Sequence, residues 1–213
     1  MDTNNLDLKT VGIIIAGLIL TETARTMATV HLTAPVLLIL GVTRLVQSAM
    51  ILGVVFVHTR GLAAIGLHSR QLLPGMKMGL VWSAGFGLLT AVGFGILQLL
   101  DLHPLTLLRV SLPAQPGMRG LFFLVGGIVA PIAEEIFFRG ILYGYFRRWG
   151  VIPAVCFSTL LFSVAHSGVS MVQASGGLLF AIAYEMEKKL TTPMVIHAAG
   201  NLALFSLSAW MSG

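Results

Sequence analysis

Long apolar stretches dominate this chain of 213 residues and constrain its fold more than any other feature. A helix needs about 20 mostly apolar residues to cross the hydrocarbon core of a bilayer. Charged residues make up only 10% of the chain, against roughly a quarter in an ordinary soluble domain. We therefore expect an all-α polytopic membrane helix bundle of about seven to eight helices, and we exclude a soluble enzyme. The expected spans are residues 10–30, 35–57, 78–100, 120–146, 151–166, 171–187 and 193–211.

Basic residues between these segments predict how the bundle lies in its membrane. With the amino terminus inside, many more of them fall in inner loops than in outer loops, as the positive-inside rule requires. We expect a multi-pass protein of the cell inner (plasma) membrane with a cytoplasmic amino terminus. The inner set is Lys9, Arg60, Arg70, Lys77, Arg147, Arg148, Lys188 and Lys189, and the outer set is Arg25, Arg109 and Arg119.

Other compositional features exclude several function classes. The isoelectric point near 9.9 is typical of nucleic-acid binding, but the basic residues do not form a groove-binding patch, so no nucleic-acid partner is expected. The single Cys156 excludes intrachain disulfides and cysteine-based zinc sites.

Three ionisable residues cluster within one expected span: Glu134, Glu135 and Arg139. Ionisable groups at bilayer depth are costly, so they are functional candidates by default. Residues four apart share a helix face, so Glu135 and Arg139 are expected to pair. Glu134 lies about 100° further round the helix and has no partner within its own span. The spacing predicts a supporting role for the pair and proton chemistry for Glu134; the alternative is an ion network that only locks helices together.

Two further polar motifs lie on later expected spans. The fifth span ends at His166, and the seventh begins with His197 and Asn201, which share one face at a spacing of four. Two alanines and a glycine separate that second pair and leave it open to a neighbouring helix or a substrate. A lone histidine at a span end is more often an interfacial residue than a catalyst. Together, however, one free carboxylate, two imidazoles and a carboxamide favour a reaction site within the bundle.

Peptide hydrolysis is the chemistry that this set of side chains fits. It needs a base to take a proton from water and donors to hold the tetrahedral oxyanion. A carboxylate with an imidazole supplies the first, and a second imidazole with a carboxamide supplies the second. The sequence contains no His-Glu-x-x-His motif for a zinc protease, no Asp within any expected span for an aspartyl dyad, and no Gly-x-Ser-x-Gly turn. The rival class is a non-hydrolytic membrane carrier or scaffold with a buried Glu/His relay.

The three motifs occur in order, each on its own expected span, as Glu134-Glu135-x-x-x-Arg139, Phe162-x-x-x-His166 and His197-x-x-x-Asn201. With them the chain resembles the family of CAAX prenyl endopeptidases and bacteriocin-processing enzymes, called CPBP or Abi proteases. The resemblance covers about residues 120–210. It implies a glutamic-type intramembrane endopeptidase.

Residue by residue, the resemblance implies a role for each motif position. Glu134 would activate water with the help of His166. His197 and Asn201 would form the oxyanion hole, and the pair of Glu135 and Arg139 would support the site.

No cofactor is expected on this interpretation. Zinc is the alternative, because Glu134, His166 and His197 together would make a two-His, one-Glu site with an open position. The metal-free interpretation is favoured because Asn201 is a poor zinc ligand but a good oxyanion donor.

The expected depths of the motifs disagree. At about 1.5 Å per residue, Glu134 and His166 lie more than half-way from the inner surface. His197 follows Lys189 closely and should lie nearer to that surface. Either the seventh helix begins deep within a funnel, or one of the expected boundaries is wrong.

The expected partners are membrane lipid and a hydrophobic peptide or the C-terminal tail of a membrane-anchored substrate protein. The resemblance suggests a bacterial enzyme that removes C-terminal sorting tails or processes peptides. We treat residues 1–213 as one integral membrane domain, with family-variable spans in 1–118 and a catalytic core in 119–213.

Overall fold

The apolar stretches form helices that begin and end at local capping signals. The computed structural model describes residues 6–102, 105, 108, 110–166 and 171–212. Asp7 precedes helix α1 (Leu8–His31) and accepts a hydrogen bond from the Thr10 N–H at 2.8 Å, as an N-cap does. Helix α2 (Val36–Thr59) ends where Arg60 takes a left-handed backbone with φ +55°.

Regular structure in the described part of the chain is helical, which confirms the expected all-α bundle. Among the described residues, five helical runs are long and apolar enough to cross a membrane, so the protein is a multi-pass membrane protein; they are Leu8–His31, Val36–Thr59, Ala63–Leu99, Pro116–Trp149 and Thr191–Met211. The expected spans 151–166 and 171–187 are also helices, but they fall short of that length. The remaining elements are α3 (Ser69–Leu99), α4 (Pro116–Leu124), α5 (Ala130–Glu135), α6 (Gly144–Phe146), α7 (Val151–Ala165), α8 (Met171–Glu187) and α9 (Thr191–Ser212).

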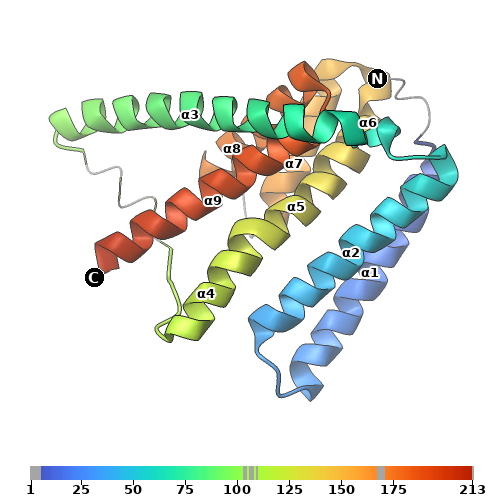
Figure 1. Cartoon of the computed structure of the whole chain (residues 1–213), viewed down its shortest axis with the longest axis horizontal. Coiled ribbons are helices and arrows are strands. Elements are labelled where there is room, and N and C mark those ends of the chain that lie inside the picture. Colours follow the sequence, from blue (N-terminus) through green and yellow to red (C-terminus); the bar gives the residue numbers. More distant parts are fainter. Residues whose placement is uncertain (1–5, 103–104, 106–107, 109, 167–170, 213) are drawn as a thin grey trace.

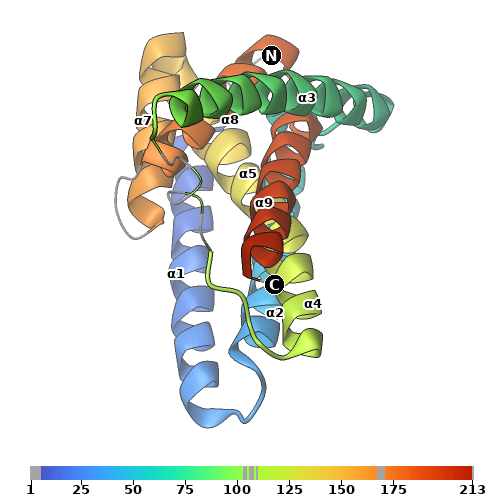
Figure 2. The same ribbon diagram turned by 90° about the vertical axis from the view of Figure 1, so that its left-hand side faces the viewer.

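The helices pack in pairs around a central one. Helices α1 and α2 form one antiparallel pair, α7 and α8 form another, and α3 packs mainly on α9. Figures 1 and 2 show α3 crossing one end of the other long helices, while the line of α4 and α5 runs between α2 and α9. This line contacts α2, α7, α8 and α9 through its successive segments. Side chains on its different faces therefore meet different partners.

The central helix is interrupted by two wider π-helical turns, at Val125–Val129 and Ile136–Tyr143. Pro131 lies between them. A proline has no N–H to donate and its ring clashes with the carbonyl four residues earlier, so a wider turn accommodates it. Turns of this kind are frequent at functional sites.

The start of helix α9 lies inside the bundle. Leu190 and Thr192 are fully buried. The Leu190 N–H donates to the Gly66 carbonyl at 3.0 Å, and the Thr192 hydroxyl donates to the Gly75 carbonyl at 3.1 Å. The segment from Gly66 into α3 thus covers the start of α9, while the depth of His197 in a membrane stays a prediction.

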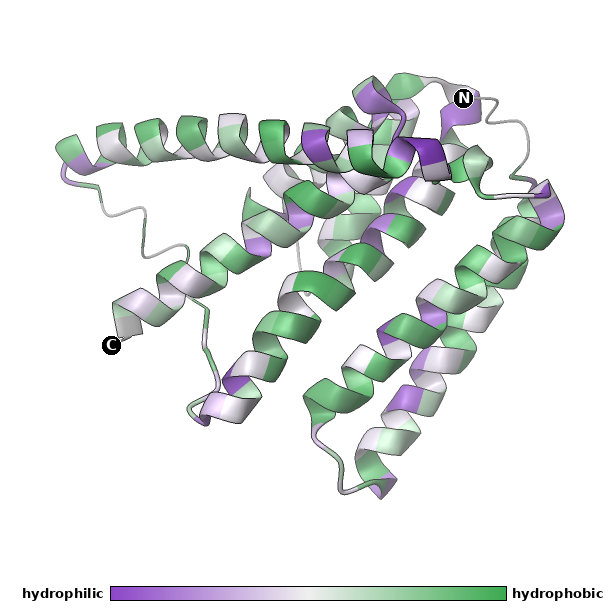
Figure 3. Ribbon diagram, in the orientation of Figure 1, coloured by the Kyte–Doolittle hydropathy of each residue, from purple (hydrophilic) through white to green (hydrophobic). Residues whose placement is uncertain are grey.

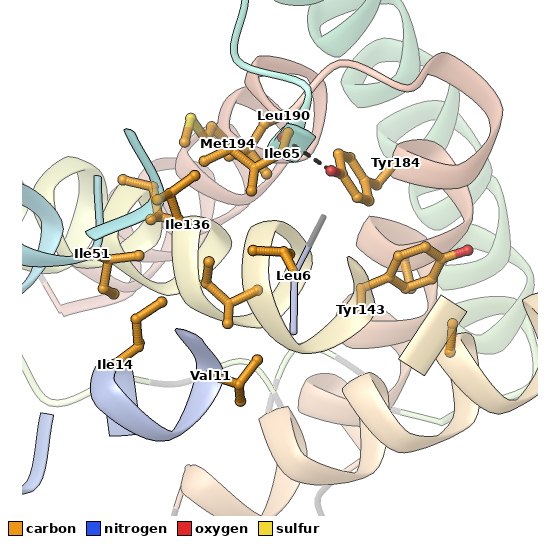
Figure 4. Close-up of a cluster of buried hydrophobic side chains, with 14 residues drawn as sticks. Leu6, Val11, Ile14, Ile51, Ile65, Ile136, Tyr143, Tyr184, Leu190 and Met194 are labelled. Atoms are coloured by element: carbon orange, nitrogen blue, oxygen red, sulfur yellow. Dashed lines mark hydrogen bonds between the residues drawn. The ribbon is translucent and has the colours of Figure 1, made fainter. Parts of the chain in front are cut away.

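Apolar side chains from distant parts of the chain form the main core near one end of the bundle (Figure 4). Ile14 of α1, Ile51 of α2 and Ile136 of the central helix are almost completely buried there. The Tyr184 hydroxyl from α8 donates to the Ile65 carbonyl at 2.9 Å. This core fixes α1 and α2 against the central helix.

Hydropathy along the ribbon follows the pattern of a membrane protein (Figure 3). The helices are mostly hydrophobic along their length, and hydrophilic positions gather at the end that carries α6 and the start of α3. A few hydrophilic positions interrupt α1 and α2 midway along their length. Because such positions are costly in a bilayer, they are candidates for function.

Candidate active site

Glu134 lies at the end of α5, between the two π-helical turns, and meets both motif histidines. Its Oε2 is 3.3 Å from His166 Nε2 and 3.8 Å from His197 Nε2. His166 follows the last residue of α7, and His197 lies in the second turn of α9. Three motifs that are far apart in the sequence thus converge on one carboxylate oxygen.

Hydrogen bonds on the far side of each ring determine which nitrogen carries the proton. His166 Nδ1 is 2.8 Å from the Phe162 carbonyl oxygen, which only accepts, so Nδ1 is the donor. His197 Nδ1 is 2.8 Å from Glu135 Oε1, and that carboxylate is already paired with Arg139. Nδ1 of His197 is therefore also a donor. Both imidazoles present Nε2 to Glu134, as is common where a second partner orients a functional histidine.

Glu135 and Arg139 are in contact, as their four-residue spacing predicts, and the contact is completely buried. Arg139 Nη1 donates to Glu135 Oε1 at 2.9 Å, and both side chains are 0% exposed. Arg139 Nη2 also donates to the Gly177 carbonyl on α8 at 2.9 Å. A Cβ at Gly177 would lie only 3.1 Å from the Phe162 ring, so a glycine is needed for α8 to approach this closely.

Aromatic rings enclose the buried guanidinium and one imidazole. The Arg139 guanidinium carbon lies 4.7 Å from the Phe162 ring centroid and 5.2 Å from that of Phe180, within the range of cation–π attraction. The Phe180 ring stacks on His197 with centroids 4.6 Å apart. These contacts fix the ring plane of His197.

Asn201 lies one turn beyond His197 on α9, and its described hydrogen bond goes to the backbone. Its Nδ2 donates to the Gly126 carbonyl at 2.9 Å. In a π-helical turn a carbonyl accepts from the residue five positions on, as Val125 does from the Ala130 N–H. For Gly126 that residue is Pro131, which has no N–H. Asn201 therefore satisfies a carbonyl that Pro131 cannot satisfy, and its second amide N–H has no described partner.

A cavity of about 330 Å³ opens beside Glu134 and His166. Its opposite wall carries three polar side chains from the amino-terminal helices, namely Glu22, Arg44 and Gln47. His197 and Asn201 are not among its lining residues. The rest of the lining is apolar and consists of Leu18, Ile51, Ala133, Phe137, Phe138 and Ala165.

Sequence reasoning did not assign Glu22, Arg44 or Gln47 to the site. The available signal was their position, because charged residues within apolar spans are functional candidates even outside any motif. It also missed the hydrogen bond from His197 to Glu135, since residue spacing within one helix cannot predict a partner on another.

Among the described residues, no group of three His, Cys, Asp or Glu side chains is arranged to hold a metal ion. The zinc site on Glu134, His166 and His197 stays an alternative.

The segment that carries these residues matches a known protein family. Residues 116–203 match the family model described as type II CAAX prenyl endopeptidase, Rce1-like. The match includes all three motifs. No solved structure matches the chain significantly.

Two curated proteins are similar over part of their length. The chain is 29% identical over 90 residues to "Membrane-embedded CAAX protease MroQ" of Staphylococcus aureus (strain USA300), which covers 38% of this chain and 36% of that protein. It is 30% identical over 84 residues to "Putative membrane peptidase YdiL" of Bacillus subtilis (strain 168), which covers 38% of this chain and 34% of that protein. The matched segment thus spans about a third of the length of these relatives. Residues 116–203 of this chain are thus similar to CAAX-protease-like membrane proteins.

Proposed function

We propose that this protein is a membrane-embedded endopeptidase that hydrolyses a peptide bond of a membrane-associated substrate with water activated by Glu134. One observation carries the proposal: a single oxygen of Glu134 faces the Nε2 atoms of His166 and His197, next to a cavity of about 330 Å³. A structural ion pair needs neither two imidazoles nor an adjoining cavity. The match of residues 116–203 to the Rce1-like family model supports the same reaction class.

Glu134 and His166 are the proton-transfer pair. Because His166 Nδ1 donates to a carbonyl, its Nε2 is free to exchange a proton with Glu134 Oε2 at 3.3 Å. A water between this pair and the substrate gives up a proton to the pair, while its oxygen bonds to the scissile carbonyl carbon. As the carbon–nitrogen bond breaks, the same proton passes to the leaving amine.

The proposed oxyanion donors are Nε2–H of His197 and the second amide N–H of Asn201. His197 donates from Nε2 when both ring nitrogens carry a proton, because Nδ1 already donates to Glu135. Both donors lie on α9, and neither residue is among those that line the cavity. The substrate carbonyl therefore has to lie between α5 and α9.

Glu135 and Arg139 have a positioning role in this mechanism. Glu135 holds the Nδ1 proton of His197, and Arg139 holds Glu135. The pair touches no substrate atom, because both side chains are fully buried.

The substrate proposed is a hydrophobic peptide or the C-terminal tail of a membrane-anchored protein, processed in a bacterial inner membrane. The relatives from two bacteria carry names of membrane peptidases, which supports this class. Removal of C-terminal sorting tails and processing of small peptides are the two forms that it includes.

Cleavage of a peptide panel by the purified protein tests the proposal. The protein is reconstituted in nanodiscs with fluorogenic hydrophobic peptides, and products are identified by mass spectrometry. Loss of a general base lowers rates by about 10²–10⁴-fold, so Glu134→Gln is expected to be nearly inactive. Glu187→Gln removes a carboxylate from the end of α8, away from the cavity, and is expected to cleave at the wild-type rate. Equal cleavage by wild type and Glu134→Gln across the panel would favour the carrier or scaffold alternative.

Chelation tests the zinc alternative separately. The metal-free mechanism predicts the same cleavage rate before and after prolonged treatment with a strong zinc chelator. Activity that is lost to the chelator and restored by added zinc would replace it with a zinc mechanism on Glu134, His166 and His197.

A further inference from the structure

The second polar wall of the cavity, formed by Glu22, Arg44 and Gln47, has no role in the proposed mechanism. Arg44 lies in the central part of α2, far from both helix ends. A cation at that depth in a bilayer is costly and is normally kept for function. Across the cavity from it lie Glu134 and His166.

Hydrogen bonds hold the Arg44 guanidinium in one orientation. Its Nη1 donates to Glu22 Oε1 at 2.8 Å and to Gln47 Oε1 at 2.6 Å. Gln47 is itself 2% exposed, and its Nε2 donates to the Thr21 hydroxyl at 3.0 Å and to Glu22 at 3.1 Å. The guanidinium is therefore preorganised rather than free to turn.

The same guanidinium keeps an unused donor. Arg44 Nε is buried and has no acceptor among the described residues. A buried donor without an acceptor is destabilising, and an oxygen ligand would remove that cost. The Nε edge of a guanidinium donates two parallel N–H bonds, which match the two oxygens of a carboxylate.

Arg44 is the cation among the residues that line the cavity, where the lining carboxylates are Glu22 and Glu134. The Glu22 carboxylate is shared between Arg25, whose Nε donates to Oε2 at 2.6 Å, and Arg44. Because Glu22 also pairs with Arg25, it neutralises the charge of Arg44 only in part. The Arg44 side chain is 27% exposed, although its Nε atom is itself buried.

We propose that Arg44 binds a carboxylate of the peptide substrate and so selects where the chain is cut. The scissile bond lies at Glu134 and His166, and the carboxylate lies on the opposite wall of the same cavity, only a few residues away along the peptide. This inference rests on the proposed function for the identity of the ligand as a peptide. The carboxylate comes from a free C-terminus or from an Asp or Glu side chain.

Photo-crosslinking in the Glu134→Gln protein tests the proposal without requiring hydrolysis. Three dodecanoylated hydrophobic peptides carrying benzoylphenylalanine serve as probes in phosphatidylcholine nanodiscs: one with a free C-terminus, one with a C-terminal amide, and one amide with a Glu beside the end. A bidentate carboxylate contact is expected to lower the half-saturating concentration of a carboxylate probe about tenfold relative to the plain amide. Preference for the free acid alone identifies the C-terminus as the source. Equal preference for the Glu peptide identifies any nearby carboxylate.

Variants of Arg44 and Thr21 distinguish a role in ligand binding from a role in holding α1 against α2. Arg44→Gln is expected to abolish the preference for carboxylate probes, and Arg44→Lys, which keeps the charge but not the paired donors, to retain only part of it. Thr21→Val weakens the hydrogen bonds between α1 and α2 but leaves Arg44 in place, and it is expected to keep the full preference. If Arg44→Gln fails to fold, the partial loss in Arg44→Lys decides the question. Equal crosslinking of acid and amide probes, or a preference that survives in both Arg44 variants, would overturn the proposal. A protein that crosslinks as expected but cleaves nothing would instead contradict the proposed function.

Discussion

Two faces of one helix turn carry adjacent glutamates in opposite environments. On the sealed face, Glu135 and Arg139 are 0% exposed and are surrounded by α8, α9 and aromatic rings. On the cavity face, Glu134 and His166 are 17% and 29% exposed and line a space of about 330 Å³. Because consecutive residues lie about 100° apart on a helix, a single step along the chain moves a carboxylate from one environment to the other.

The difference matches the two roles proposed for these glutamates. A carboxylate that must exchange protons needs access to water and a partner that can also hold a proton, which Glu134 has in His166. A carboxylate that orients another group needs a fixed charge and no exchange, which Glu135 has in Arg139. The sealed face supports the cavity face through the hydrogen bond from Glu135 to His197.

Loss of Arg139, the cation on the sealed face, should have the largest effect on the free energy of unfolding. Arg139→Met leaves the Glu135 charge buried without its partner, so the free energy of unfolding should fall by about 3–5 kcal/mol. Glu134→Gln, on the cavity face, should change it by less than about 1 kcal/mol. Denaturant unfolding of the purified proteins in the same detergent measures both values.

The double variant Glu135→Gln/Arg139→Met is the control for buried charge. It removes both charges but keeps an oxygen that accepts from His197, so it should recover much of the stability that Arg139→Met loses. Equal losses for Arg139→Met and Glu134→Gln would show that the two faces do not differ in the way described.

Substitution of Asn201 tests whether the structural contacts around Glu135 and Arg139 continue one turn further along α9. If its main contact is the Gly126 carbonyl that Pro131 cannot satisfy, Asn201→Ala should cost about 1–3 kcal/mol of unfolding free energy. In a Pro131→Ala background the new N–H at position 131 can bond to Gly126, and the same substitution should cost clearly less. Thermal unfolding of the four proteins in this double-mutant cycle measures the coupling.

A coupling near zero would contradict the structural role of Asn201. The rate of peptide cleavage by the same four proteins tests separately whether the second amide N–H of Asn201 acts on the substrate. If that N–H holds the oxyanion, Asn201→Ala should slow cleavage to a similar extent in both backgrounds, even where its cost in stability is small.

Much of the fold could be predicted from apolar length alone. The expected spans 10–30 and 35–57 differ from α1 and α2 by only a few residues, because Asp7, Pro35 and the turn at Arg60 mark those ends locally. The third span was expected to begin at residue 78, but α3 begins at Ser69. The first residues of α3 are amphipathic, so they do not extend the apolar stretch. The burial of the start of α9 was not predictable, because it depends on the segment from Gly66 to Gly75 folding over it.

The contacts of the site also fall into a predictable and an unpredictable group. Spacing within one helix predicted the contact of Glu135 with Arg139, because i and i+4 positions are neighbours in any helix. Contacts between helices, such as that of Glu134 with His166, were inferred only from the motifs. The π-helical turns and the cavity wall around Arg44 were not foreseen. The division into family-variable spans (1–118) and a catalytic core (119–213) stays a prediction, and the roles of the site residues stay proposals.

Glu185 offers a third environment for a carboxylate and sharpens the comparison at the polar end of α8, outside the five long spans. Its partial burial alone would raise its pKa, but hydrogen bonds from Arg147, Lys188 and Tyr143 outweigh that and lower the pKa to about 2. A carboxyl whose pKa is lower in the folded state stabilises the fold above its ordinary pKa, and this contribution is lost as the pH falls toward about 2. After allowance for solvent screening we expect a contribution on the order of 1–2 kcal/mol at neutral pH. The difference in unfolding free energy between wild type and Glu185→Gln should therefore be full at pH 7 and shrink steadily below about pH 4.5. Unfolding measured from pH 7 to pH 3 tests this, and a difference that stays constant over that range would mean that the Glu185 charge contributes nothing to stability.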